Sequence, residues 1–179
     1  MRILVTNVHW YNRGDEAALL TFVKELRLQG HSVAVQFALA SLPPEIGGIV
    51  GGRVYPGLVT KRHAFLMVFP WLLRQLPAVK QQARLAQHFD VVLHGPGGPS
   101  IGDLYRRREL PYLLRLKIAI DSDVDIGICG PSVGPFGIWW RNVLRRRILR
   151  RAKVLAVRES LSRDYLQQLD PQLEPDRKS

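Results

Sequence analysis

The chain has 179 residues, of which 46 % are apolar and 23 % are charged, so it suits a single globular domain with a hydrophobic core. Its one cysteine excludes a disulfide framework and a cysteine-rich metal site. The net charge of +11 indicates an acidic partner: anionic lipid, a phosphorylated substrate or nucleic acid. Nucleic acid is the weakest of the three, because no basic tail or RNA-binding motif accompanies the charge. The N-terminus lacks a secretory signal pattern, so the expected location is the cytoplasm.

Strand and helix patterns alternate along the chain. Residues 1–8 form an apolar strand pattern, and apolar residues then recur at helical spacing from Leu19 to Leu26. Further strands are expected at 32–37, 90–94, 125–129 and 153–157, with a short extended piece at 52–55 inside a loop of residues 41–57. Further helices are expected at 110–120, 138–151 and 160–169. This alternation predicts an α/β fold with a doubly wound, mostly parallel, Rossmann-like sheet covered on both faces.

A polar loop follows the first strand, at the point where a helix begins. It contains Asn12, Gly14, Asp15 and Glu16. One interpretation is local: Asp15 or Asn12 caps the helix and Glu16 complements its dipole. The other is functional, because ligands of open α/β sheets bind beyond the carboxyl ends of strands. The loop lacks the G-x-G-x-x-G fingerprint of dinucleotide sites, and no cofactor is expected.

Three further strand ends carry loops of the same kind. HGPGGPSIGD begins at the end of the strand at 90–94 and is not a P-loop, since no Gly-Lys-Ser/Thr closes it. GPSVGPFG follows the strand at 125–129, and RESLS follows the strand at 153–157. The candidate binding residues in these loops are Gly95, Gly97, Gly98, Asp103, Ser132, Gly134, Arg158 and Ser162. Turns and helix caps explain each loop alone, but four polar strand ends on one sheet edge predict a binding site, without a metal ion.

Residues 64–76 are apolar and have two interpretations. The segment is far shorter than the roughly 20 residues of a membrane-spanning helix, and Pro70 interrupts it. A core helix pair kinked at Pro70 therefore competes with a helix that lies in a membrane interface. Cys129, inside a strand pattern, is expected to be a small buried hydrophobe.

Residues 139–151 also have two interpretations. Trp140, Val143, Leu144 and Ile148 share one face of a helical wheel, and Arg145, Arg146 and Arg150 lie around that face. The first interpretation is a sheet-covering helix whose arginine stems pass the edge of the core. The second is a helix that binds anionic lipid through these arginines.

The order of these motifs resembles that of the polysaccharide pyruvyl transferase family. The resemblance is carried by NRGDEA at residues 12–17, the glycine-rich residues 94–103, GPSVGPF at 130–136 and RESLS at 158–162. It extends over almost the whole chain. Pro96 and Pro99 depart from the plainer glycine run typical of the family.

The resemblance implies an architecture of two Rossmann-like domains that face a cleft, as in GT-B glycosyltransferases. Residues 1–169 would form the N-terminal domain and residues 170–179 a linker or tail, with the second domain missing. The donor-binding basic residues would lie largely in that second domain. A second half-domain chain is therefore an expected partner, and the isolated chain is expected to be inactive.

The resemblance also implies a reaction. Phosphoenolpyruvate is the expected donor and a sugar or lipid-linked oligosaccharide the expected acceptor, in the cytoplasm or at the inner face of the membrane. Ketal formation requires general acid–base groups, together with cations or N–H groups for the anions. Asp15, Glu16 and Asp103 are candidates for the sugar hydroxyls and Arg158 for an anion, while His9 and His94 are candidates for proton transfer. His94 has the alternative of a structural role, and no catalytic residue is assigned.

Two functions of other classes fit the same sequence. One is a GT-B-like glycosyltransferase half domain, which would prefer a nucleotide sugar to phosphoenolpyruvate. The other is a non-catalytic module that binds a membrane surface or a partner through its arginines.

Overall fold

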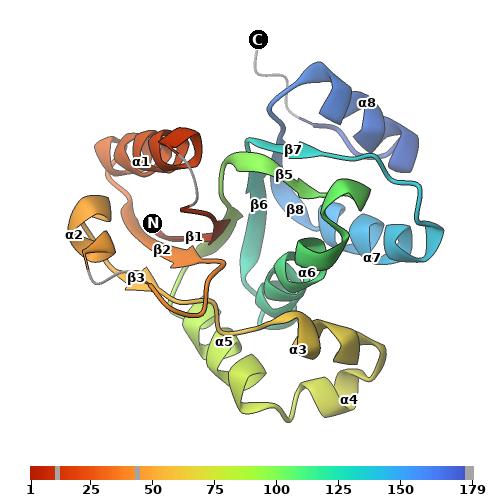
Figure 1. Cartoon of the computed structure of the whole chain (residues 1–179), viewed down its shortest axis with the longest axis horizontal. Coiled ribbons are helices and arrows are strands. Elements are labelled where there is room, and N and C mark those ends of the chain that lie inside the picture. Colours follow the sequence, from red (N-terminus) through yellow and green to blue (C-terminus); the bar gives the residue numbers. More distant parts are fainter. Residues whose placement is uncertain (11–12, 43–44, 176–179) are drawn as a thin grey trace.

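The computed structural model describes residues 1–10, 13–42 and 45–175 and contains a six-stranded, wholly parallel sheet (Figure 1). The strands are β1 (Arg2–Val8), β2 (Ser32–Phe37), β3 (Val54–Tyr55), β4 (Val91–His94), β6 (Asp125–Cys129) and β8 (Ala152–Ala156). Their order across the sheet is β3-β2-β1-β4-β6-β8. This is the doubly wound order, with the reversal between β1 and β4. The predicted Rossmann-like α/β class is confirmed.

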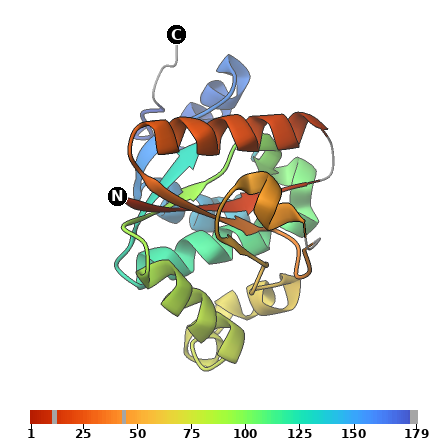
Figure 2. The ribbon, with the colours of Figure 1, turned by 90° about the vertical axis from the view of Figure 1, so that its left-hand side faces the viewer.

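Helices cover both faces of the sheet (Figure 2). They are α1 (Arg13–Leu28), α2 (Ile46–Val50), α3 (Lys61–Phe65), α4 (Pro70–Leu73), α5 (Pro77–Gln87), α6 (Arg106–Asp121), α7 (Trp139–Leu149) and α8 (Ser160–Leu169), with 3-10 turns at Leu66–Val68 and Asp103–Tyr105. Leu19 of α1 packs with Val5 and Val35 on one face. Leu113 and Leu116 of α6 pack with Leu4 and its neighbours on the other face. The alternation of β1 side chains between the two clusters thus fixes which helix covers which face.

Two segments expected from the sequence to be glycine-rich turns form a second, two-stranded parallel sheet. Its strands are β5 (Gly97–Ile101) and β7 (Pro131–Val133). A Cβ atom at Gly102 would lie only 2.6 Å from the backbone oxygen of Gly134, so the close approach of the two segments requires glycine. The expected loop at 41–57 likewise contains one element more than predicted, the short helix α2.

The apolar face predicted for α7 is only partly buried. Trp139, Trp140 and Val143 are 76 %, 52 % and 62 % exposed, whereas the side chain of Arg145 is fully buried. Ile148 does face the core. The apolar stripe of the helical wheel is divided, because ion pairs described below hold Arg145 inside.

The other two arginines proposed for lipid binding hold the C-terminal segment. Arg146 Nε donates a hydrogen bond to the backbone oxygen of Leu169, and Arg150 forms an ion pair with Asp170. The proposal that Arg145, Arg146 and Arg150 form one lipid-binding surface is therefore corrected for Arg145, which is not at the surface.

Residues 64–76 divide into short helical turns at the surface. Ala64 and Leu73 are buried, but Phe65 and Trp71 are each 70 % exposed and Phe69 is also exposed. The segment therefore packs on the core with one side, as a core helix pair would, and exposes its aromatic residues on the other side. No helix in the described ranges has the length and apolar character needed to cross a membrane. Cys129, expected to be buried, is half-buried.

Candidate functional site

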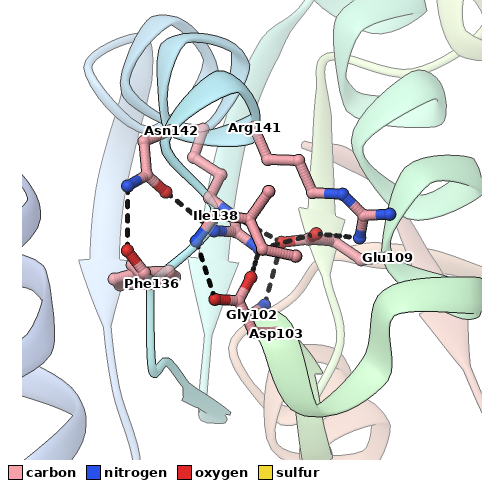
Figure 3. A network of polar contacts seen from close by, with 8 residues as sticks. Gly102, Asp103, Glu109, Phe136, Ile138, Arg141 and Asn142 are labelled. Atoms are coloured by element: carbon pink, nitrogen blue, oxygen red, sulfur yellow. Dashed lines mark hydrogen bonds and ion pairs between the residues drawn. The ribbon is translucent and has the colours of Figure 1, made fainter.

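A buried ionic cluster holds the glycine-rich segments at the carboxyl edge of the sheet (Figure 3). Arg145 of α7 donates to both carboxylate oxygens of Glu109 on α6, at 2.7 and 2.8 Å, and to Asp103 at 2.7 Å. Arg141 Nη1 lies 3.3 Å from Oε2 of Glu109. The side chains of Arg145 and Glu109 are both 0 % exposed. Two arginines and two carboxylates thus form a group without net charge that packs inside the fold.

The cluster reaches the backbone of both loops. Glu109 accepts a hydrogen bond from the N–H of Gly102, at the end of β5. Asp103 accepts one from the N–H of Ile138, beyond β7. Asn142 links Arg145 to the carbonyl oxygen of Phe136. The two loops therefore have fixed positions relative to α6 and α7.

Asp103 and Arg145 each stabilise the charged form of the other. Burial favours the neutral form of Asp103, but the hydrogen bond and charge of Arg145 outweigh it and hold the pKa of Asp103 below its usual value. Burial likewise acts to lower the pKa of Arg145, and the hydrogen bonds to Glu109 and Asp103 outweigh it and raise that pKa. Both groups are thus charged at neutral pH, and the Asp103 carboxylate, proposed for sugar hydroxyls, is engaged by Arg145 and Ile138.

A second buried network runs from β5 to β1 through His94. The Asn7 side-chain N–H donates to His94 Nδ1 at 2.9 Å, so Nε2 carries the proton and donates to Ser100 Oγ at 2.6 Å. Burial, together with the charges of His9 and Arg115, lowers the pKa of His94 to about 3. The imidazole is neutral at pH 7 and both ring nitrogens have partners. His94 is therefore structural, the second of the two roles considered for it.

The same Asn7 holds a buried arginine. Asn7 adopts φ 63°, a left-handed conformation that asparagine tolerates, at the irregular end of β1. Its side-chain oxygen accepts a hydrogen bond from Arg115 Nη1 at 2.8 Å. Arg115 Nη2 donates to the carbonyl oxygens of Val59 and Ala38. The arginine thus ties α6 to the segments that follow β2 and β3.

A cavity of about 700 Å³ opens beside these strand ends. His9 follows β1, Ala38 follows β2 and Gly57 follows β3, and all three line the cavity. Lys61 and Arg62 of α3 and Arg108, Tyr112 and Arg115 of α6 contribute polar groups to its wall. A pocket at the carboxyl ends of β1, β2 and β3 is where an open α/β sheet binds ligands.

His9 is held on the wall of this cavity by Tyr112, whose hydroxyl hydrogen-bonds to Nε2. Burial lowers the pKa of His9 to about 4, and the charge of Arg108 acts in the same direction, while Asp15 acts in the opposite one. His9 is therefore neutral at pH 7 and able to accept a proton. The effect of Asp15 also shows that the first turn of α1 lies near His9.

The structure brings part of the predicted site together. Asp15 Oδ1 lies 3.7 Å from the position that a Cβ at Gly97 would occupy, so the start of α1 faces β5. Glu16 is half-buried beside Asp15 in the first turn of α1, and Gly14 is exposed. Asn12 lies outside the described residues, and Gly98 is part of β5.

Other predicted residues support the loops. Gly95 packs against Val8, and a Cβ there would lie 2.5 Å from Val8 Cγ1. Gly134 has φ 90° and packs on Tyr165. Ser162 hydrogen-bonds to the N–H of Val133. Ser132 is half-buried and Arg158 is exposed at the end of β8.

Four residues on which these networks depend were not among those predicted from the sequence: Asn7, Glu109, Tyr112 and Arg115. Two signals were present. Asn7 is a polar residue near the end of an apolar strand, and Arg115 is one of two cations, with Lys117, in the apolar run of α6. Such residues are buried only with partners, and the partners come from distant strands. Among the described residues, no group of three or more His, Cys, Asp or Glu could hold a metal ion.

Comparison with known proteins identifies the family. The model of the polysaccharide pyruvyl transferase family matches residues 12–172, and the chain belongs to this family. No curated protein matches the chain.

Two solved structures illustrate the likeness of fold. Spinosyn rhamnosyltransferase with thymidine diphosphate is 16 % identical over 88 % of this chain and 45 % of its own, with a TM-score of 0.45. Thermus thermophilus UDP-glucose 4-epimerase with NAD is 20 % identical over 73 % of this chain and 37 % of its own, with a TM-score of 0.40. The chain thus spans less than half the length of either structure.

The ionic cluster makes a stability prediction. Glu109→Gln removes the charge that compensates buried Arg145 and should lower the free energy of unfolding by about 3–5 kcal/mol. Urea unfolding of the variant measures this loss. Glu25→Gln, at an exposed position of α1, is the matched control and should change stability by less than about 0.5 kcal/mol. Equal stability of the two variants would contradict the role of the cluster.

His94 makes a prediction about pH. Its pKa is about 3 when folded and 6.5 when unfolded, so the unfolded chain binds more protons between these values. Stability should therefore fall as pH is lowered below 6.5, with His94 contributing about 1.4 kcal/mol per pH unit. Urea unfolding at several pH values should show a shallower dependence for His94→Gln than for the wild type. Parallel curves would exclude a buried neutral His94.

Proposed function

We propose that this chain forms the acceptor-facing half of an enzyme that transfers pyruvate from phosphoenolpyruvate to two hydroxyls of a sugar. The observation that carries the proposal is the family match over residues 12–172, together with the four polar strand ends on one sheet edge. We place the reaction in the synthesis of cell-surface polysaccharides, with a sugar or lipid-linked oligosaccharide as acceptor. The second domain of a GT-B-like architecture would supply most of the donor contacts.

The reaction needs a group that accepts protons from sugar hydroxyls. As the two hydroxyl oxygens bond to the central carbon of phosphoenolpyruvate, its C–O bond to phosphate breaks. One hydroxyl proton ends on the methylene carbon, which becomes methyl, and the other ends on the released phosphate. His9 lines the cavity and is neutral at pH 7, and Asp15 lies close enough to influence the pKa of His9, so these two groups are the proposed proton acceptors. Tyr112 orients His9 through its hydroxyl.

The sequence-derived contacts remain part of the proposal. Asn12, Gly14, Asp15 and Glu16 would contact the acceptor, with the two carboxylates accepting hydrogen bonds from its hydroxyls. Gly95, Gly97 and Gly98, in and just before β5, would leave room for the sugar to approach the backbone. Asp103, Ser132, Gly134 and Ser162 would position the neighbouring loops, and Arg158 would pair with an anionic group of substrate.

The test is Asp15→Asn, assayed with the second domain present. Asp15 lies in the first turn of α1 and is half-buried, and asparagine has nearly the same shape, so the variant should lose only a small interaction with the helix dipole and should still fold. Loss of the carboxylate should reduce kcat by about 10²-fold or more, the range of general acid–base catalysis. Glu25→Gln on the same helix is the control. Wild-type turnover by Asp15→Asn would leave the interaction with the dipole of α1 as the whole role of Asp15.

A second prediction concerns the donor. Because most donor contacts are assigned to a second domain, the purified 179-residue chain should form no ketal from phosphoenolpyruvate and acceptor. Addition of the second domain, in the same chain or as a separate one, should restore phosphate release. Ketal formation by the purified chain alone would contradict the assignment.

A further inference from the structure

Arg115 is a buried cation whose described hydrogen-bond partners are all uncharged. It is 2 % exposed, and its guanidinium donates to the side-chain oxygen of Asn7 and to the carbonyls of Ala38 and Val59. It forms no ion pair with any carboxylate of the described residues, and its Nε has no hydrogen-bond partner among them. A buried charge without a counter-charge costs several kcal/mol. Arg145 is equally buried but forms ion pairs with two carboxylates, Asp103 and Glu109. Arg115 therefore differs from Arg145 in having no such partner among the described residues.

Arg115 lies at the wall of the 700 Å³ cavity, and no described carboxylate balances its charge. A Cβ at Gly57 would lie 2.6 Å from Arg115 Nη2 and 2.7 Å from the carbonyl oxygen of Ala38, so glycine leaves room for this arrangement. Burial lowers the pKa of Arg115 only to about 10, and the group stays charged at neutral pH. The positive charge is therefore permanent and faces the cavity.

Further cations line the same cavity. Lys61 and Arg62 are exposed on α3 and form no ion pair with a described carboxylate, and Arg108 lies on α6. The described lining contains neither aspartate nor glutamate. Even with Asp15 near His9, the positive charges at this cavity outnumber the negative ones, and the resulting field attracts anions.

We propose that this cavity binds the phosphate group of a phosphorylated sugar, with Arg115 as the buried counter-charge and Lys61 and Arg62 at the entrance. The inference deepens the proposed function and rests on it for the sugar. The cavity is large enough for more than an inorganic anion, since pockets of about 300–1,000 Å³ hold whole small molecules. Leu39, Val59 and Pro111 supply apolar wall for the uncharged part of the ligand.

A sugar phosphate can come from solution or from a lipid. The segment that begins with Lys61 and Arg62 continues into the exposed side chains of Phe65, Phe69 and Trp71. Exposed aromatic residues beside cations are typical of surfaces that enter a membrane interface. The phosphate chemistry is shared by both sources, and the aromatic residues distinguish them.

Calorimetric titration of the full chain with glucose 1-phosphate, and with glucose as the uncharged control, tests the soluble source. Sedimentation with phosphatidylcholine vesicles, with and without a polyprenyl phosphate, tests the lipid source.

The variant Lys61→Gln/Arg62→Gln should weaken phosphate binding at least about tenfold, a loss of about 1.4 kcal/mol. Arg53→Gln/Arg84→Gln removes the same charge from exposed positions away from the cavity and is the matched control. Arg115→Met, checked for folding by circular dichroism, should abolish binding.

Binding of glucose 1-phosphate that depends on Lys61 and Arg62 supports the proposal with a free sugar phosphate. Binding only to vesicles with polyprenyl phosphate, lost in Phe65→Ser/Trp71→Ser as well, supports it with a lipid-linked one. Binding of neither probe, or equal loss in the Arg53→Gln/Arg84→Gln control, overturns it. Because no step requires phosphoenolpyruvate or turnover, failure here is distinct from failure of the Asp15→Asn test.

Discussion

Arg145 and Glu109 form the contact on which the carboxyl edge of the sheet depends. Both side chains are fully buried, and Asp103 and Arg141 complete a cluster without net charge. Removing any one partner would leave a charge inside the protein, so the four groups stay together. Through Gly102 and Ile138 the cluster holds the end of β5 and the segment after β7. Glycine-rich backbone can therefore form a rigid edge.

A second constraint joins that edge to the cavity. Ser100 on β5, His94 on β4, Asn7 on β1 and Arg115 on α6 form one continuous hydrogen-bonded series. Each member is buried, and a partly satisfied network of this kind would be costly. Arg115 is the end of the series and the only member that carries a permanent charge. The series thus holds the positive charge of Arg115 at the carboxyl edge of the sheet, where an open α/β sheet binds ligands.

Much of the fold is predictable from local pattern. The apolar strand at β1 and the helical spacing in α1 are local properties, and both elements appear within a few residues of expectation. The strand character of β5 was missed because it depends on pairing with β7, which is distant in sequence. The burial of Arg145 on α7 was missed because its partners lie outside that helix, on α6 and in the turn before it.

The candidate site shows the same division. Asp15 was predicted because polar residues after a buried strand are a local signal, although the structure places it in the first turn of α1 and not in a loop. The cavity cations were not, because Lys61 and Arg115 meet only when α3 packs on α6. Single buried charges in apolar runs, such as Arg115, are the sequence signal that points to such a site.

The most direct test of the substrate-binding face is an NMR titration of the chain with a sugar phosphate, which locates the bound ligand residue by residue. We predict saturable shifts of the His9 ring signals and of the backbone amides of Ala38 and Gly57, which line the cavity. A bound phosphate should also raise the pKa of His9 from about 4, since a nearby anion favours the imidazolium. Shifts confined to the opposite end of the sheet, or an unchanged His9, would contradict the assignment of this edge as the substrate-binding face.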